Sequence, residues 1–419
     1  KKISVNNILG ASGTATLASA AITGAATVGT TLVVTGKVTA NTNIEITRGL
    51  LNDGTSTGVG ATALAATTAG ATGNTALGYR AMYQATTGAN NVAVGINSLS
   101  AASMTGSGNV AIGQLAASAL TTGSSNVFIG DTVAFNSAIT ASDCIAIGQN
   151  SMRSASAISG ANNIGIGKDT FRNLSSGLSN VAIGRESANQ LTTGQTNTYV
   201  GAAAGYNNLT GDNNVGIGFQ ALVAATVSSL TAVGSNALVS NTSGANNTAV
   251  GRSALAAVVT TSNNTALGYL AGNATTGGDT TAIGSNALAL STGGNQNTAV
   301  GSNAMGSAIV TGGFNTAIGV STGFSLTSGT SNTFLGTEAG LNTTIGSSNI
   351  CIGRGAVSAA TDSNVIAIGS STYYVGTNGA ANTYFTTATA LSTGTLPLTC
   401  GFLRVIINGT ARKIAVYAD

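Results

Sequence analysis

The amino-acid sequence predicts an all-β fold, a parallel β-solenoid or β-roll of about 18 coils with about 17 residues in each. Three observations predict it: a five-residue phrase recurs at a nearly constant interval, its apolar residues alternate, and a glycine closes it. The phrase reads Asn74-Thr-Ala-Leu-Gly78 and returns as Asn91-Val-Ala-Val-Gly95. Self-similarity at a fixed period is the sequence signature of stacked repeats.

The closing glycine marks each copy of the phrase. It recurs eighteen times at intervals of 16 to 19 residues, and a weaker first copy ends at Gly60. The residue before it is always Ile, Val or Leu, the residue two before is mostly Ala, and the residue four before is mostly Asn. The closing glycines are Gly78, Gly95, Gly113, Gly130, Gly148, Gly167, Gly184, Gly201, Gly218, Gly234, Gly251, Gly268, Gly284, Gly301, Gly319, Gly336, Gly353 and Gly369.

Each copy predicts one coil. Apolar residues at alternate positions indicate a short, half-buried strand, and a glycine such as Gly78 or Gly95 allows the backbone to turn after it. The rest of the repeat holds a second apolar pair and then Thr, Gly and Asn, which predicts a second strand and a second turn. We expect the coils to stack about 4.8 Å apart, so that equivalent residues form ladders.

The ladders define an inside and an outside. We expect the Asn ladder, which begins with Asn74 and Asn91, to bond side chain to side chain between coils. The aliphatic residue before each glycine is expected to fill the interior, and the alanine two before it then forms a stripe on the opposite strand face. That stripe is either an exposed surface of a monomer or the contact at which three rods pack, and we favour the second. The aliphatic residues expected inside include Ile112, Ile129, Ile147 and Ile183.

The phrase also carries a family resemblance. The segments "NNVAVG", "GNVAIG" and "NNTAVG" resemble the head repeats of trimeric autotransporter adhesins, although those repeats are usually shorter. The longer form, "NTAIG" followed by "ALxxxTTGxN", is similar to repeats in bacteriophage tail-fibre and head-fibre proteins. The resemblance covers residues 74–369 and implies a left-handed parallel β-roll in a homotrimer.

The composition argues against several classes of function. Only 6% of the residues are charged and the net charge is +3, which offers little to a nucleic-acid backbone. No apolar run reaches the roughly 18 residues that a membrane span requires. There is no histidine, and the eleven carboxylates are scattered. We therefore expect no catalytic residues, no metal, no cofactor and no enzymatic activity.

The cysteines do not predict a disulfide framework. Cys144, Cys351 and Cys400 are far apart and odd in number. This pattern fits a fibre assembled in a reducing compartment better than one exported unfolded.

Successive coils carry charges at equivalent places. Lys168 and Asp169 in one coil match Arg185 and Glu186 in the next, so the four side chains are expected to form one small band. A solvated ladder of ion pairs is favoured over a receptor-binding patch.

The two ends differ from the repeats. Residues 1–58 alternate apolar and polar residues and are expected to form a β-stranded shaft or attachment segment, before the repeat domain at 59–369. Residues 370–419 are expected to form a C-terminal cap or tip, with a terminal hairpin at Asn408-Gly409. The tip either only caps the rod or also binds a receptor through its aromatic residues. The candidate receptor-binding residues are Tyr373, Tyr374, Tyr384 and Phe385.

These observations favour a structural or adhesive fibre of a bacteriophage virion. The expected partners are two further copies of the chain, a virion attachment protein at the N-terminus and a glycan or protein receptor on the host surface. The alternative is a bacterial surface adhesin or appendage subunit with the same type of head. An autotransporter is expected to continue into a coiled-coil stalk and a membrane anchor, which do not follow the repeats in this sequence. A purely structural decoration differs from the phage fibre only at the tip.

Overall fold

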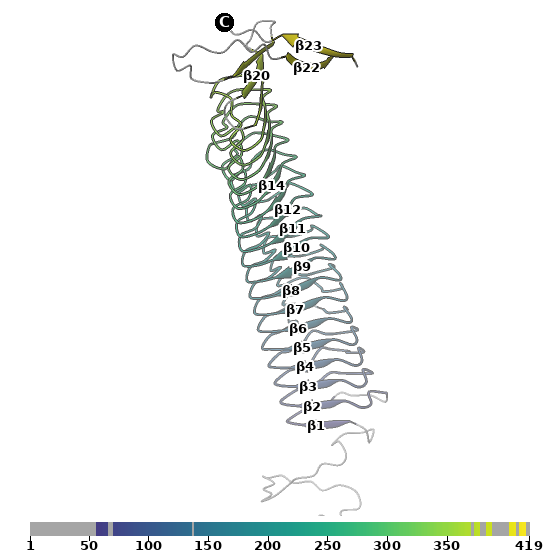
Figure 1. Cartoon of the computed structure of the whole chain (residues 1–419). Helices are drawn as coiled ribbons and strands as arrows, with labels where there is room; N and C mark the ends of the chain where they lie inside the picture. The colour runs from purple at the N-terminus through teal and green to yellow at the C-terminus, as the bar shows by residue number, and fades with distance from the viewer. Residues whose placement is uncertain are drawn as a thin grey trace, which may run out of the picture. The chain divides into compact units, whose positions relative to one another are not determined.

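A computed structural model describes residues 56–65, 70–135 and 138–369, together with the backbone of four strands nearer the C-terminus. The described repeats form a parallel β-solenoid, in which one coil lies on the next along a single column (Figure 1). The described residues contain no helix. The predicted fold class is confirmed, and the weak first copy before Gly60 is a coil of its own.

Each coil contributes one short strand. Every strand pairs in parallel with the strand of the next coil, and equivalent repeat positions lie opposite each other, as Val110 opposite Val127 and Ile112 opposite Ile129. The second strand predicted for each coil is wrong, because the other side is held by turns and a few isolated bridges such as Leu120 with Ile139. The strands are β1 (Thr57–Val59), β2 (Thr75–Leu77), β3 (Val92–Val94), β4 (Val110–Ile112), β5 (Val127–Ile129), β6 (Ile145–Ile147), β7 (Ile164–Ile166), β8 (Val181–Ile183), β9 (Thr198–Val200), β10 (Val215–Ile217), β11 (Thr231–Val233), β12 (Thr248–Val250), β13 (Thr265–Leu267), β14 (Thr281–Ile283), β15 (Thr298–Val300), β16 (Thr316–Ile318), β17 (Thr333–Leu335), β18 (Ile350–Ile352) and β19 (Val365–Ile368).

Four antiparallel strands follow the parallel stack. β20 (Tyr373–Thr377) pairs with β19, and β21 (Thr383–Thr387) pairs with β20. An antiparallel strand thus covers the last parallel edge, which would otherwise present unpaired backbone groups to other chains. β22 (Phe402–Ile407) and β23 (Thr410–Ala415) form the hairpin that the Asn-Gly signal predicts.

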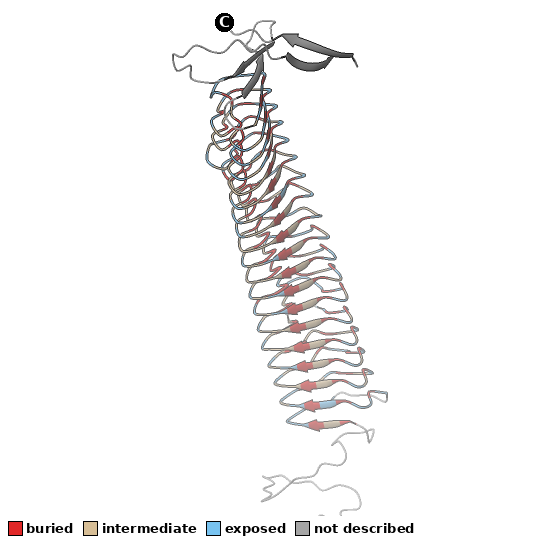
Figure 2. Cartoon of the chain, in the orientation of Figure 1, coloured by how far each residue is buried: buried red, intermediate tan, exposed pale blue. Residues whose placement is uncertain are grey.

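The strand faces are the reverse of those expected. The central residue of each three-residue strand is buried and is small in most coils, as Ala111 and Ala146 are, whereas the residue before the closing glycine is half-buried or exposed (Figure 2). The central residue therefore points inward and the residue before the glycine points outward. The expected interior aliphatic column is therefore wrong, and the alanine stripe is not a surface. The four isoleucines placed inside by the sequence are half-buried or exposed, namely Ile112, Ile129, Ile147 and Ile183.

The interior is filled from the opposite side of the coil. Leu, Met or Phe residues four positions after the closing glycine are fully buried, as Met82, Leu238 and Leu255 are, and they face the column of small strand residues. Several coils bury a second large side chain beyond that position, as Leu174 in the coil of Phe171. Burying a Leu or Met side chain contributes about 1.5–3 kcal/mol, so these buried residues together provide much of the apolar stabilisation within a single chain.

A ladder of buried asparagines joins the coils, as the sequence predicts. The Asn91 side-chain nitrogen donates to Asn74 Oδ1 at 3.2 Å and to the Gly106 carbonyl at 3.0 Å. Asn91 Oδ1 accepts in turn from the backbone N–H of Asn109 at 2.8 Å. A buried asparagine is tolerated because its donors and acceptor are paired. The ladder is interrupted at Cys144, Leu230 and Thr280, whose backbone N–H groups still donate to the preceding asparagine.

Left-handed backbone recurs in every coil, at residues other than glycine. In the coil after β8, Glu186 has φ 59° and Ala188 has φ 48°. Their backbone N–H groups donate in opposite directions along the axis, from Glu186 to the Lys168 carbonyl of the preceding coil and from Ala188 to the Ala204 carbonyl of the next. Alternation of left- and right-handed residues is how a turn without a strand keeps its hydrogen bonds between coils.

The closing glycines form a column in which the backbones of neighbouring coils nearly touch. Gly184 has φ +125°, and a Cβ built on it would lie 2.6 Å from the Gly201 carbonyl oxygen. Neither that φ nor that space is open to a residue with a side chain. This explains why the phrase always ends in glycine.

We predict that Gly184→Ala lowers the free energy of unfolding by about 2–4 kcal/mol, because it adds both a strained φ and a clash with the next coil. The matched control is Gly293→Ala, at an exposed glycine whose built Cβ meets nothing within 4 Å. The control is expected to change stability by less than about 0.5 kcal/mol. Denaturant unfolding followed by circular dichroism measures both, and equal effects would contradict the close-approach explanation.

Candidate functional site

The most extensive surface feature is the outward face of the strands. The first and third residues of each three-residue strand point outward, and in β1 to β18 they are half-buried or exposed. Ile112 is 38% exposed and Leu267 is 49% exposed. Because the coils stack in register, these side chains make two parallel rows along the solenoid. The sequence prediction missed this surface, although a strand with two large residues on one side and one small residue on the other contained the signal.

The six strands β3 to β8 present only aliphatic side chains on this face. Both outward residues of each strand are Val or Ile, which gives twelve branched side chains in two rows. We call this set the aliphatic block. Its members are Val92, Val94, Val110, Ile112, Val127, Ile129, Ile145, Ile147, Ile164, Ile166, Val181 and Ile183.

The seven strands β11 to β17 present a mixed face instead. The third residue is still Val, Ile or Leu, but the first is always threonine. Within the described part of the chain none of these seven hydroxyls has a hydrogen-bond partner, and the threonines are half-buried or exposed. We call these strands the threonine block. Its threonines are Thr231, Thr248, Thr265, Thr281, Thr298, Thr316 and Thr333.

Charged side chains lie beside the outward face and not on it. No outward strand residue from β1 to β18 is charged. The position after the closing glycine carries the charges instead, for example Lys168, Arg185 and Arg252. The outward face is therefore a neutral strip, apolar or hydroxylated along its length, with charge at its margin.

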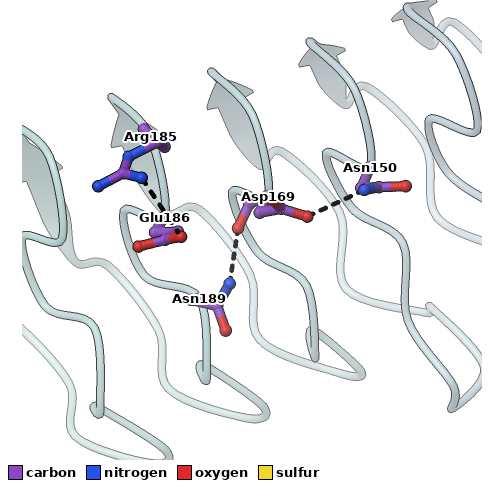
Figure 3. A network of polar contacts seen from close by, with 5 residues as sticks. All are labelled: Asn150, Asp169, Arg185, Glu186 and Asn189. Atoms are coloured by element: carbon purple, nitrogen blue, oxygen red, sulfur yellow. Dashed lines mark hydrogen bonds and ion pairs between the residues drawn. The ribbon is translucent and has the colours of Figure 1, made fainter.

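The predicted charged band contains one ion pair, not a ladder. Arg185 and Glu186, neighbours in one coil, approach to 3.9 Å between Nη1 and Oε1 (Figure 3). Asp169, in the preceding coil, accepts from Asn150 Nδ2 at 3.0 Å, and its backbone carbonyl accepts from Asn189 Nδ2 at 2.9 Å. Because the Arg185 side chain is 65% exposed, this pair contributes little to stability.

Arginine lies over tyrosine at two places outside the strands. The Arg80 guanidinium lies 4.5 Å from the centroid of the Tyr83 ring and 5.8 Å from that of Tyr79. Arg252 lies 5.7 Å from the Tyr269 ring of the next coil. Tyr79 and Tyr269 are about half exposed. These contacts occupy one face of the rings and fix the arginine side chains, but they do not enclose a site.

The other predicted features lie mostly outside the described residues. The backbones of β20 and β21 place Tyr373 and Tyr374 on one strand and Tyr384 and Phe385 on its antiparallel partner. The side chains of these four candidate receptor-binding residues are not described, nor is the segment 1–55 of the predicted shaft. Among described residues, no three potential metal-ligating side chains cluster, and no helix could span a bilayer.

Two buried cysteines face the interior. Burial raises the pKa of the Cys144 thiol, and it raises the pKa of the Cys351 thiol from the ordinary 9.0 to about 11. Both thiols are free and buried. A protonated, enclosed thiol is a poor nucleophile, so these cysteines act as small apolar residues. Cys351 occupies the central strand position that alanine holds in most coils.

Comparison of the chain with known protein families, with curated proteins and with solved structures finds no match in any of the three. The resemblance to phage fibres and autotransporter heads therefore rests on the repeat phrase alone.

We predict that the free energy of unfolding falls as pH rises from about 9 to about 11. Above the ordinary pKa the unfolded chain releases the Cys351 proton, whereas the folded chain retains it until the pH reaches about 11. Deprotonation therefore favours the unfolded chain in this range, and the stability that the buried, protonated thiol contributes at lower pH is lost. Cys351→Ala, which carries the common residue of that position, should show a shallower decline in denaturant unfolding across this range. An equal decline in the two proteins would contradict the prediction.

Proposed function

We propose that the protein is a non-enzymatic, elongated homotrimer that serves as a structural or adhesive fibre on a bacteriophage virion. The observation that carries the proposal is the uncharged outward face, which runs along the strands β1 to β18 of an uninterrupted stack. A repeat with little variation along its length provides reach and a continuous contact surface. Extended surfaces of this kind are what solenoids use for binding.

The size of the outward face supports self-association. Eighteen strands at about 4.8 Å give a strip of roughly 85 Å in length. With a width of about 10 Å for two rows of side chains, the strip offers on the order of 850 Å² per copy, which matches the roughly 800 Å² that each partner contributes to a stable interface. One row of the strip is Val, Ile or Leu in every strand from β1 to β18, and a continuous aliphatic row of this length is more than a monomer ordinarily leaves in water.

Three copies are proposed because each coil has a single such face and because the repeat phrase resembles those of homotrimeric heads. Around a common axis each strip can pack against two others, which removes it from water without requiring a second apolar face. The contact is therefore made by the outward Val, Ile, Leu and Thr residues, and not by the buried alanines.

In the proposed fibre, the N-terminal segment attaches to the virion and the C-terminal tip meets a glycan or protein receptor on the host. The alternative function is a bacterial surface adhesin, which uses the same rod but is carried by a bacterial cell and not by a virion. Electron microscopy with an antibody against the chain discriminates the two, because label on particles supports the virion fibre and label on cell surfaces supports the adhesin.

We predict that the wild-type chain runs in size-exclusion chromatography with light scattering at three times its monomer mass of 40.4 kDa. The double variant Ile112→Lys and Ile147→Lys should dissociate, because it would place six ammonium groups in a desolvated trimer contact. Its circular dichroism spectrum should remain that of the wild type, since both side chains point outward from the coil.

The matched control is the double variant Gln114→Lys and Gln149→Lys. These residues lie two positions after the two isoleucines, in the same coils, and their side chains are not buried. The control is expected to stay trimeric. A wild-type chain that is monomeric at all concentrations would refute the trimer, and dissociation of the control alone would place the contact elsewhere.

A further inference from the structure

The outward face of the strands changes character along the solenoid, whereas the buried centres of the same strands do not. The central buried residue is Ala or Gly in most strands of both the aliphatic block and the threonine block. The closing glycines continue through both, and the Asn ladder runs through both with interruptions at Cys144 in the first and at Leu230 and Thr280 in the second. On the side of the coil opposite the strand, the buried residues also become more polar, from Leu120, Leu174 and Leu191 in the coils of the aliphatic block to Asn241, Thr275 and Ser291 in those of the threonine block. Because the exchanged Val, Ile and Thr residues themselves lie on the outward face, the consequence of their exchange falls on whatever covers that face.

We propose that the aliphatic block, β3 to β8, holds the copies of this chain together, and that the threonine block, β11 to β17, forms a hydrated seam that adds little to association. The inference rests on the proposed self-assembly. It assigns most of the free energy of association to the six strands of the aliphatic block, which are one third of the strip. The occupant of both blocks is a second copy of this chain. No charged residue stands at the outward positions of either block to select a different partner.

The difference between the blocks follows from desolvation. Transfer of a Val or Ile side chain from water to an apolar contact is favourable in proportion to the area buried. A threonine brings a hydroxyl, and none of the seven has a hydrogen-bond partner within the described chain. Each hydroxyl must then find a partner across the interface or retain a water molecule, because burying it unpaired is costly. Bridging waters satisfy such groups at little net cost or gain.

The geometry makes a water-filled row the simplest arrangement. The seven threonines pair in register from Thr231 opposite Thr248 to Thr316 opposite Thr333, so their hydroxyls repeat at the spacing of the strands, about 4.8 Å. That spacing is too long for one hydroxyl to donate directly to the next. A water molecule between neighbouring rungs is within reach of both.

Three triple variants of the full chain test the proposal, each measured as the protein concentration at which half of the chains are assembled. Val92→Thr with Val110→Thr and Val181→Thr brings threonine into the aliphatic block and should raise that concentration at least tenfold. Thr248→Val with Thr281→Val and Thr316→Val, at the same strand position in the threonine block, should lower it at least tenfold.

The third variant is the control for the chemical change itself. Val233→Thr with Val250→Thr and Val300→Thr makes the same exchange in the threonine block, at the neighbouring outward row, and should shift the concentration less than threefold. All three keep residue types that this strand face already uses, so each variant should retain the wild-type circular dichroism spectrum and thermal midpoint at concentrations where the chain is dissociated.

The outcomes separate this inference from the proposed function. A wild-type chain that assembles, but whose third variant is weakened as much as or more than the first, overturns the assignment to the aliphatic block and leaves self-assembly standing. A weakened second variant overturns the hydrated seam. A wild-type chain that never assembles overturns both.

Discussion

The close approach of one coil to the next is the constraint on which the structure depends. Strands pair in register from β1 to β19, and the closing glycines allow backbone to lie against backbone where a Cβ would collide. Once that spacing is set, the Asn side chains reach the neighbouring rung and the turns bond along the axis. An isolated coil has no core of its own, so stability arises between neighbours, as in other repeat proteins.

The same spacing limits what the interior can hold. Where a strand centre is large, glycine compensates: a Cβ on Gly205 or Gly216 would meet the Tyr199 ring at 2.5 or 2.9 Å. The Tyr199 hydroxyl accepts from Asn208 at 2.5 Å, so its polar end is paired although buried. Since the coil interior is this narrow, most aliphatic branches are displaced to the outside. The outward face is thus a consequence of coil width, and self-association is its proposed use.

The period and the closing glycines predicted the fold class and the number of coils, the recurring asparagine predicted the Asn ladder, and Asn408-Gly409 predicted the terminal hairpin. They did not predict which strand face is internal, because alternation alone assigns Ile112 and Ala111 to opposite sides without saying which side is inside. The prediction placed the larger residue of the strand in the core. In the structure, leucines and methionines from the turns already fill the core, so only a small strand residue fits beside them. Left-handed residues such as Glu186 were also missed, because hydrogen bonds to the neighbouring coils, and not the local sequence, stabilise them.

The most direct test of the central claim, that coils stack in register at strand spacing, is a pair of distances measured by double electron–electron resonance. Spin labels at Gln114 and Ser235, seven coils apart, and at Gln114 and Ser302, eleven coils apart, would be placed in a chain whose three cysteines are replaced by alanine. Labelled chains would be diluted with unlabelled ones. The stack predicts distances of about 34 and 53 Å, a rise of about 4.8 Å per coil. Two similar distances, or values unrelated to the number of coils, would contradict it.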